Sequence, residues 1–556
     1  MPFHRYSAAP ALELPDRTWP DRPIVRAPLW CSVDLRDGNQ ALAEPMDLPR
    51  KHKMFALLCR MGFKQIEVGF PAASQIDFDF VRELVELDLV PDDVTIQVIT
   101  QARAELIERT FEAVDGARQA IVHLYNSTSP LQRRVVFDID RAGAIDLAVS
   151  GTRLCTKLAE DHRGGVVSFE YTAESFSSTE PDFALEICEA VMTVWQPAPD
   201  RPIIVNLPAT VECAPPNVFA DQIEWMHRNL SHRESVCLSV HPHNDRGSGI
   251  AAAELAVMAG ADRVEGCLFG NGERTGNVCL VTLGMNLFAQ GIDPMLDLSD
   301  LGAIRQVAEE CTRIPVHPRH PYAGDLVYTA FSGSHQDAIK KGFESMEREA
   351  ARLGRSPRQV PWAVPYLPID PADVGRTYEA VIRVNSQSGK GGTAYLLQSR
   401  SGLALPRRLQ VEFARTVQRY SESHSAEVDT ERIWELFGSE YLRPGSRLTV
   451  AEHTSRPAAG GPVEVTALVS LDGGELRVSG SGPDVAAAFA ASLAAGGLAV
   501  RTSHLEEQVV GEDTAVYAEC VVGGETLWGV GLAADPARAA VLAVASAVNR
   551  TSAQAV

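Results

Sequence analysis

The chain alternates short β-rich runs with amphipathic helical runs, and this alternation constrains the fold more than any other feature. Eight β-rich runs follow one another between residues 28 and 291, at 29–37, 64–71, 94–100, 120–127, 166–175, 202–210, 236–245 and 262–277. The runs between them place apolar residues three and four positions apart, which is typical of helices. Eight strand–helix units predict an α/β fold, a (β/α)8 TIM barrel. A doubly wound open sheet is the alternative, and it explains eight consecutive units less well.

The remainder of the 556 residues is too long to belong to the same core. We expect an N-terminal extension over 1–27, the barrel over 28–325, helical linker subdomains over 326–430 and an α+β domain over 431–556. The last part contains two similar halves, each with a Gly-X-Gly sequence (480–482 and 529–531) followed by Asp and an Ala-rich helix. This pattern predicts an internal duplication. Coincidence in a tail rich in Ala and Gly is the alternative.

Composition excludes several classes of protein. The formal net charge of −21 is unsuited to extended contact with nucleic acid, which needs massed Lys and Arg. No apolar run reaches the length of a membrane span, and the first residues lack the hydrophobic block of a signal peptide. Ten cysteines without a CxxC pair indicate reduced thiols. We therefore expect a cytoplasmic protein that binds neither nucleic acid nor membrane.

Four polar residues follow three strands that are neighbours in a closed barrel. His241 and His243 lie two positions apart and so share one face of the seventh strand. Asp37 follows the first strand and Asn277 the eighth. Two imidazoles, a carboxylate and an amide oxygen suit a divalent cation such as Zn²⁺, Mn²⁺ or Mg²⁺. Alternatively, Asp37 and Asn277 cap helices, and the histidines are ordinary polar residues at a strand end.

Four segments resemble the 2-isopropylmalate synthase family: "DLRDGNQAL" (34–42), residues 241–277, "VNSQSGKGGTAYLL" (384–397) and "LPRRLQVEFARTVQ" (405–418). The resemblance covers nearly the whole chain. The His-X-His-Asn-Asp and "GNGERTGN" patterns are shared with homocitrate and citramalate synthases and HMG-CoA lyase. The family condenses acetyl-CoA with 2-oxoisovalerate and hydrolyses the thioester, which is the first committed step of leucine biosynthesis. This transferase activity is what the resemblance implies.

The resemblance also implies roles for individual residues. A divalent metal held by Asp37, His241, His243 and Asn277 would chelate the 2-oxo acid, and K⁺ remains open as an activator. Arg36 would stabilise the developing alkoxide, a task that suits a permanently charged guanidinium. The candidates for the base that removes the acetyl proton are Glu174 and the His335–Tyr366 pair. The pair lies in the linker, which in the family reaches over the partner subunit's site, and whether His335 acts as base or in later water activation stays open.

Three further barrel residues match substrate positions of the family: His123, Thr172 and Thr210. Thr172 departs from the expected serine but keeps the hydroxyl. The strand ends 169–176 and 205–212 contain no Lys or Arg to pair with a second carboxylate. This favours an aliphatic 2-oxo acid over 2-oxoglutarate, without separating 2-oxoisovalerate from pyruvate. For the phosphates of CoA the candidates are Arg274 and the pair Arg133–Arg134, for which solvated surface arginines are the alternative.

The family is homodimeric, and its tail binds L-leucine as a feedback inhibitor. The glycines of the tail would let its backbone approach a small ligand closely. The alternative is a tail that only stabilises a dimer. For the whole chain, two other functions stay open, namely a citramalate synthase that uses pyruvate and a catalytically idle amino-acid sensor. The complete set of site residues argues against idleness.

Overall fold

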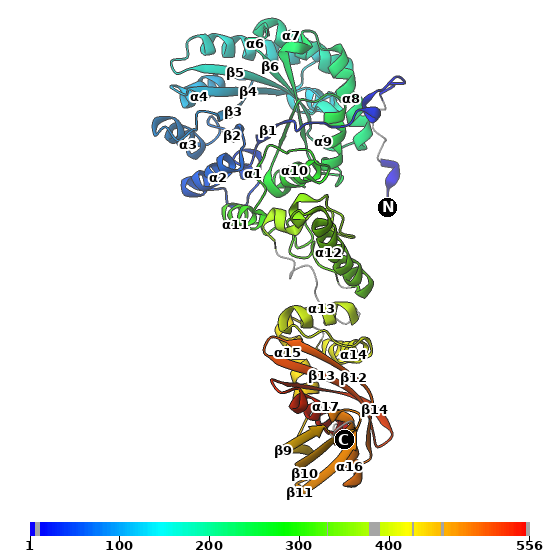
Figure 1. Ribbon diagram of the computed structural model, residues 1–556. Coiled ribbons are helices and arrows are strands. Elements are labelled where there is room, and N and C mark those ends of the chain that lie inside the picture. The colour runs from blue at the N-terminus through cyan, green and yellow to red at the C-terminus, as the bar shows by residue number, and fades with distance from the viewer. Residues whose placement is uncertain (6–11, 331, 377–389, 425–427, 458–460, 552–556) are drawn as a thin grey trace. The chain divides into compact units, whose positions relative to one another are not determined.

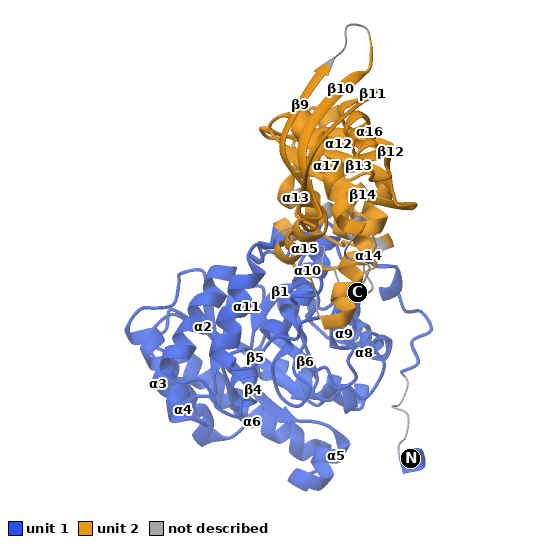
Figure 2. Ribbon diagram, turned by 90° about the horizontal axis from the view of Figure 1, so that it is seen from below, with its two compact units in different colours: residues 1–327, 373–376 blue, residues 328–372, 377–556 orange. Residues whose placement is uncertain are grey.

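The computed structural model describes residues 1–5, 12–330, 332–376, 390–424, 428–457 and 461–551. The chain divides into two compact units (Figure 2). Unit 1 contains residues 1–327 and 373–376, and unit 2 contains residues 328–372 and 377–556. Residues 384–389, the first part of one family-like segment, lie outside the described residues.

Unit 1 is a closed barrel of eight parallel strands in sequence order, surrounded by helices (Figure 1). The strands are β1 (Leu29–Ser32), β2 (Gln65–Gly69), β3 (Thr95–Gln101), β4 (Gln119–Ser127), β5 (Val166–Glu174), β6 (Ile203–Ala209), β7 (Val236–Pro242) and β8 (Arg263–Gly266). β1 pairs with both β2 and β8, which closes the sheet. The predicted TIM barrel is confirmed, and the open doubly wound sheet is wrong.

The helices of unit 1 begin and end where local chemistry favours it. They are α1 (Asp37–Gln40), α2 (Leu48–Met61), α3 (Gln75–Glu86), α4 (Ala104–Val114), α5 (Pro130–Gln132), α6 (Arg141–Glu160), α7 (Pro181–Trp195), α8 (Pro216–Asn229), α9 (Gly249–Met258), α10 (Leu280–Ala289) and α11 (Leu301–Thr312). In α2, for example, the Asp47 side chain accepts from the Arg50 N–H, and Gly62 ends the helix with φ 98°. Such caps satisfy backbone groups that a helix leaves unpaired at its ends.

Two strands are shorter than the sequence predicts, and this matters for the site. β1 ends at Ser32 and β8 at Gly266, so Asp37 and Asn277 lie on the loops that follow. The Asp34 carboxylate accepts the Leu268 N–H at 3.1 Å from both oxygens, which ties the two loops together beyond the sheet. These loops are therefore fixed relative to each other.

Among its described residues, unit 2 contains six α-helices, four of which precede two three-stranded antiparallel sheets. These four are α12 (Gly333–Leu353), α13 (Lys390–Ser401), α14 (Arg407–His424) and α15 (Thr430–Phe437). One sheet has the order β11-β10-β9 (Gly474–Gly482, Val463–Leu471, Leu448–Pro457) and is followed by α16 (Val485–Ala495). The other has the order β12-β13-β14 (Val500–Val510, Asp513–Val522, Glu525–Ala533) and is followed by α17 (Pro536–Arg550). The repeated order of three strands and a helix is what the predicted duplication requires.

The paired glycines of the tail serve packing, so the role proposed for them from sequence is wrong. A Cβ atom at Gly480 would lie 2.4 Å from the Ser492 nitrogen on α16, and one at Gly529 would lie 2.0 Å from the Ala543 oxygen on α17. The glycines let each helix approach its own sheet instead of a ligand. The Asp residues that follow, Asp484 and Asp535, cap α16 and α17.

Among the described helices, none is both long and apolar enough to cross a membrane.

Candidate functional site

A polar cavity of about 250 Å³ opens at the carboxyl ends of the barrel strands. Its lining includes nine of the residues singled out from the sequence or the resemblance: Arg36, Asp37, His123, Thr172, Glu174, Thr210, His241, His243 and Arg274. They come from four strands, β4 to β7, or the residues directly after them, and from the loops after β1 and β8. Active sites of this fold occupy that end of the barrel.

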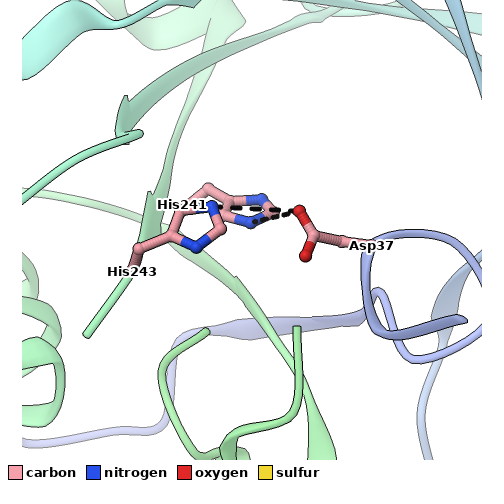
Figure 3. Close-up of side chains that lie close together, drawn as sticks. All are labelled: Asp37, His241 and His243. Atoms are coloured by element: carbon pink, nitrogen blue, oxygen red, sulfur yellow. Dashed lines mark ion pairs between the residues drawn. The ribbon is translucent and has the colours of Figure 1, made fainter. Parts of the chain in front are cut away.

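Asp37, His241 and His243 converge at one point of the cavity (Figure 3). The Oδ2 atom of Asp37 lies 3.8 Å from Nε2 of each histidine, and the two rings stack with centroids 5.2 Å apart. All three side chains are buried. The alternative of helix caps fails, because the Asp37 side chain caps no helix and α10 is capped by Cys279 instead of Asn277.

Asn277 completes this set, with its amide oxygen turned toward the histidines. Its Nδ2 donates to Asp37 Oδ1 at 2.9 Å and to the Asn271 carbonyl at 3.0 Å. The oxygen is thereby directed at His241 Nε2, 2.7 Å away. The orientation of the amide follows from the two acceptors around its nitrogen.

The hydrogen bonds of the donor set are compatible with a bound cation. Nδ1 of His241 faces the Glu265 carboxylate at 2.8 Å and therefore carries a proton. With a second proton on Nε2, His241 donates to the Asn277 oxygen; without it, Nε2 and this oxygen are both acceptors and can both bind a cation. A divalent cation held by Asp37, His241, His243 and Asn277 would take the place of this second proton.

Electrostatics keeps Asp37 charged and His243 neutral, the forms that bind a cation, but favours a proton on His241. Burial raises the pKa of Asp37, but Arg36 and the two histidines outweigh burial and hold this pKa below its ordinary value. Burial, together with His241, lowers the pKa of His243 to about 4, so this imidazole is neutral near pH 7. Burial lowers the pKa of His241, but Glu265 outweighs burial and raises it above the ordinary value. In the absence of a cation, a proton can therefore stand at His241.

Arg36 bridges two carboxylates at the edge of the cavity. Its Nη1 donates to Asp37 Oδ2 at 3.0 Å, and its Nε donates to Glu67. Burial alone would lower the pKa of Arg36, but the two carboxylates raise it, so the charge is permanent. The planar guanidinium is fixed by both partners.

The three predicted substrate residues and Glu174 lie in the same cavity. His123 Nδ1 is 2.7 Å from Glu67 Oε1, and its Nε2 is 2.6 Å from the Thr172 hydroxyl. Thr210 accepts the Ser175 N–H, and Glu174 accepts from the Ser127 hydroxyl. The apolar part of the wall consists of Phe70, Ile99, Tyr125 and Pro208.

His335 and Tyr366 lie in unit 2, so their relation to the cavity stays a prediction. The two rings stack on each other with centroids 4.0 Å apart. His335 is exposed on α12, and Tyr366 is 62% exposed with φ 65°, a conformation that non-glycine residues rarely adopt. The pair is therefore accessible and held in a specific arrangement within unit 2.

The arginines considered for CoA differ in their surroundings. Arg274 lies at the mouth and donates to Asp245 Oδ1 at 2.8 Å. Arg133 is buried, pairs with Glu180 at 2.7 Å and lies over the Phe183 ring, which is a structural role. The alternative that Arg133 is a solvated surface residue is wrong, because these contacts remove it from solvent. Arg134 is exposed.

Four charged residues beneath the cavity are not among those predicted from the sequence. Glu67, Glu170, Arg263 and Glu265 are fully buried inside the barrel, where apolar side chains are usual. Charged residues in the middle of strands expected to be buried were the available signal. His123, Glu170 and Glu265 lie close enough together to resemble a second metal site. Arg263, at 3.3 Å from Glu170 and 2.7 Å from Glu265, already supplies the positive charge there.

Comparison with known proteins gives a consistent result along the whole chain. Residues 27–308 match the family model described as HMGL-like, and residues 325–398 match that of the alpha-isopropylmalate synthase post-catalytic domain. A 2-isopropylmalate synthase of Parafrankia sp. (strain EAN1pec) is 60% identical, over 99% of this chain and 98% of its own length. The one from Thermobifida fusca (strain YX) is 58% identical over the same shares. A solved HMG-CoA lyase from Brucella melitensis aligns with 52% of this chain and 100% of its own at 16% identity and a TM-score of 0.42, too low to carry an argument.

Proposed function

The chain belongs to the 2-isopropylmalate synthase family, and from this premise we propose that it condenses acetyl-CoA with 2-oxoisovalerate. A bond forms between the acetyl methyl carbon and the keto carbon, while the methyl proton passes to a base and the keto oxygen takes up a proton. Water then cleaves the thioester, which releases CoA and 2-isopropylmalate. The reaction needs no redox partner.

The observation that carries this proposal is the fixed donor set at the barrel mouth. Four ligand groups converge there: the ligand atoms of Asp37, His241 and His243 lie within 4.8 Å of one another, and Asn277 Oδ1 lies 2.7 Å from His241 Nε2. A divalent ion at this point would supply Lewis-acid chemistry and a template for a 2-oxo acid. Mg²⁺, Mn²⁺ and Zn²⁺ all suit two nitrogens and two oxygens.

The residues around this set divide the remaining work. Arg36 directs a permanent charge into the cavity and stabilises the oxygen that becomes negative as the carbon–carbon bond forms. His123 and Thr172, linked by a 2.6 Å contact, hold the 2-oxo acid, as does Thr210. The His123–Thr172 contact and the hydrogen bond from the Ser175 N–H to Thr210 fix these side chains before substrate enters.

The proton acceptor for the acetyl methyl group has two candidates. Glu174 already lines the cavity, where Ser127 donates to its carboxylate. The accessible His335–Tyr366 stack is the alternative, supplied by the linker of a partner subunit. The hydrolysis step also needs a group that activates water, so the two candidates need not exclude each other.

The cavity wall supports an aliphatic acceptor. Phe70, Ile99 and Pro208 offer apolar contact for an isopropyl group. Citramalate synthesis from pyruvate is the second candidate, because a smaller side chain also fits. An idle amino-acid sensor is the third.

One assay separates the three. The full-length protein with Mn²⁺ is given acetyl-CoA together with 2-oxoisovalerate, pyruvate or 2-oxoglutarate, and the released CoA thiol is measured. We expect the highest kcat/KM with 2-oxoisovalerate. A higher value with pyruvate would establish citramalate synthesis, and no release with any acceptor would leave only the sensor. Repeating the assay with K⁺ in place of Na⁺ tests activation by K⁺.

We also propose that the duplicated tail binds L-leucine and lowers the activity without competing with 2-oxoisovalerate. The Gly-X-Gly sequences do not support this, since they serve packing. Support comes from the family and from the repeated strands and helices, whose symmetry offers a paired surface. Millimolar L-leucine should reduce kcat, through a coupling free energy of about 1–3 kcal/mol. If leucine neither binds nor inhibits, the tail only stabilises the assembly.

A further inference from the structure

Glu265 meets the candidate metal ligand His241 from inside the barrel and is held by residues of three other strands. Its Oε2 lies 2.8 Å from His241 Nδ1 and accepts from Asn206 Nδ2 at 3.1 Å. Its Oε1 accepts from Gln97 Nε2 at 3.1 Å and from Arg263 Nη1 at 2.7 Å. Asn206, Gln97 and Arg263 therefore all donate to this carboxylate.

Arg263 anchors this arrangement. It is fully buried and donates to Gln65 Oε1 at 2.5 Å, to Gln97 Oε1 at 2.7 Å and to the Ser239 hydroxyl at 2.9 Å. These partners stand on β2, β3 and β7, while Arg263 and Glu265 stand on β8. A charged pair tied to so many strands cannot rotate without breaking several buried hydrogen bonds.

We propose that Glu265 is a positioning residue for the metal site, one that holds His241 with its proton on Nδ1 and the Nε2 lone pair directed at Asp37 and Asn277. The inference rests on the proposed function only in requiring that a divalent cation binds here. Outer partners of this kind fix both the tautomer and the ring orientation of a ligating histidine.

A glutamine at this position cannot reproduce the arrangement, although it has the same shape. Its amide nitrogen must take the place of one carboxylate oxygen. In place of Oε1 it would face the donors Gln97 and Arg263. In place of Oε2 it would face Asn206 and donate to His241 Nδ1, which would move the imidazole proton to Nε2, where it blocks ligation.

The barrel provides a matched control in Glu170. It is also fully buried and lies 3.3 Å from Arg263, but it is not among the contacts of His241. Burial and the nearby Glu265 raise the pKa of Glu170 well above its ordinary value, so glutamine imitates its neutral form. Glu170→Gln therefore changes the same chemical group at the same depth without touching the ligand.

The experiment measures the affinity for Mn²⁺ by calorimetric titration of metal-free full-length protein, as wild type, Glu265→Gln and Glu170→Gln. We expect the Kd of Glu265→Gln to rise roughly 10- to 100-fold, as is typical for loss of an outer partner. The Kd of Glu170→Gln should stay within about threefold of wild type. Thermal melting of each variant shows whether the barrel is intact.

The outcomes separate this inference from the proposed function. Wild-type Mn²⁺ affinity in Glu265→Gln, or an equal loss in Glu170→Gln, would overturn the inference and leave the proposed function standing. If the wild type itself binds no Mn²⁺, the proposed function fails first. Should Glu265→Gln not fold, Glu265→Asp takes its place, since it keeps the charge beside Arg263 and withdraws the carboxylate from His241. A folded Glu265→Asp with wild-type affinity would also overturn the proposal.

Discussion

His241 and His243 differ in what their ring nitrogens contact, although they stand two positions apart. Nδ1 of His241 faces Glu265, whereas Nδ1 of His243 is buried without a hydrogen-bond partner among the described residues. Nε2 of both rings points at Asp37 (Figure 3). The two candidate ligands therefore differ in the neighbours that hold their rings.

We predict that His241→Ala and His243→Ala each abolish condensation in a protein that stays folded. Removing either imidazole leaves three ligands, and the affinity for Mn²⁺ should fall by at least the roughly 10- to 100-fold of outer-partner loss. The effect should be larger for His241, because its loss also strips Glu265 of a donor. CoA release, metal content and circular dichroism check this. An active, metal-loaded His241→Ala enzyme would show that the metal lies elsewhere.

Arg36→Lys should lower kcat about 10²- to 10³-fold while the affinity for 2-oxoisovalerate changes only several-fold. Lysine keeps the charge but cannot span Asp37 and Glu67 with a planar fork. Steady-state kinetics and calorimetric binding measure the two quantities. Arg60→Lys, on an exposed position of α2, is the control and should behave as wild type. Near-normal kcat in Arg36→Lys would make Arg36 a structural residue.

Asp34 gives a pH dependence of stability with a defined sign. Burial raises its pKa to about 7, from an ordinary value near 4. Between these two values the folded state binds the extra proton, so the stabilising contribution is present at low pH and is lost as the pH rises toward 7. Asp34→Asn imitates the protonated form. Relative to wild type, it should gain about 1–3 kcal/mol of unfolding free energy between pH 5 and pH 8, measured by denaturant unfolding. If the unfolding free energies of wild type and Asp34→Asn changed in parallel with pH, Asp34 would be charged throughout this range.

Among the helices and strands, the stability of the tail depends on how closely each helix packs on its sheet. α16 packs on β11, and α17 on β14. The glycines of β11 and β14 leave no room for a side chain between strand and helix. Close packing of this kind is sensitive to a single methyl group.

Gly480→Ala should therefore destabilise unit 2 by about 1–3 kcal/mol, since its Cβ would meet the α16 backbone at 2.4 Å. Gly474→Ala on the same strand is the matched control, because its Cβ would find its nearest neighbour at an ordinary 3.5 Å. Thermal unfolding midpoints of the two variants give the comparison. Equal midpoints would show that α16 can move away without cost.

In the whole chain, the residues predicted to act in catalysis fall in both units. Asp37 and the other ligands stand in unit 1, and the His335–Tyr366 stack stands in unit 2. The family resemblance implies that the second group serves the barrel of a partner subunit.

Mixed dimers test this arrangement. Asp37→Ala and His335→Ala should each be inactive alone, and heterodimers of the two should recover part of the wild-type activity. One of their two hybrid sites would carry both intact residues. Separately tagged chains, purified as verified heterodimers, are assayed for CoA release. Complete inactivity of the heterodimer would indicate that each chain completes its own site.

The barrel, the duplicated tail and the residues of the candidate metal set could all be predicted from the sequence. Alternating strand and helix patterns report burial along each element, and closure of the sheet then places the ends of the first, seventh and eighth strands together. Glycines that interrupt the local pattern could also be located in the sequence, but their structural role could not always be inferred from it. The Gly-X-Gly sequences were correctly located, yet only the packed helices show that they admit a backbone and not a ligand.

The contacts that hold the site in place could not be predicted from the sequence. Asp34 reaches the backbone of the loop after β8, Glu67 fixes Arg36, and Glu265 fixes His241, each from a different strand or loop. The residues joined by these three contacts are 234, 31 and 24 positions apart in the sequence, respectively. The alternating pattern of a strand does not reveal these contacts, because it indicates only that a side chain points inward. Which donor meets which acceptor depends on the register of eight strands around a closed barrel, and that is set by the packing of the whole unit.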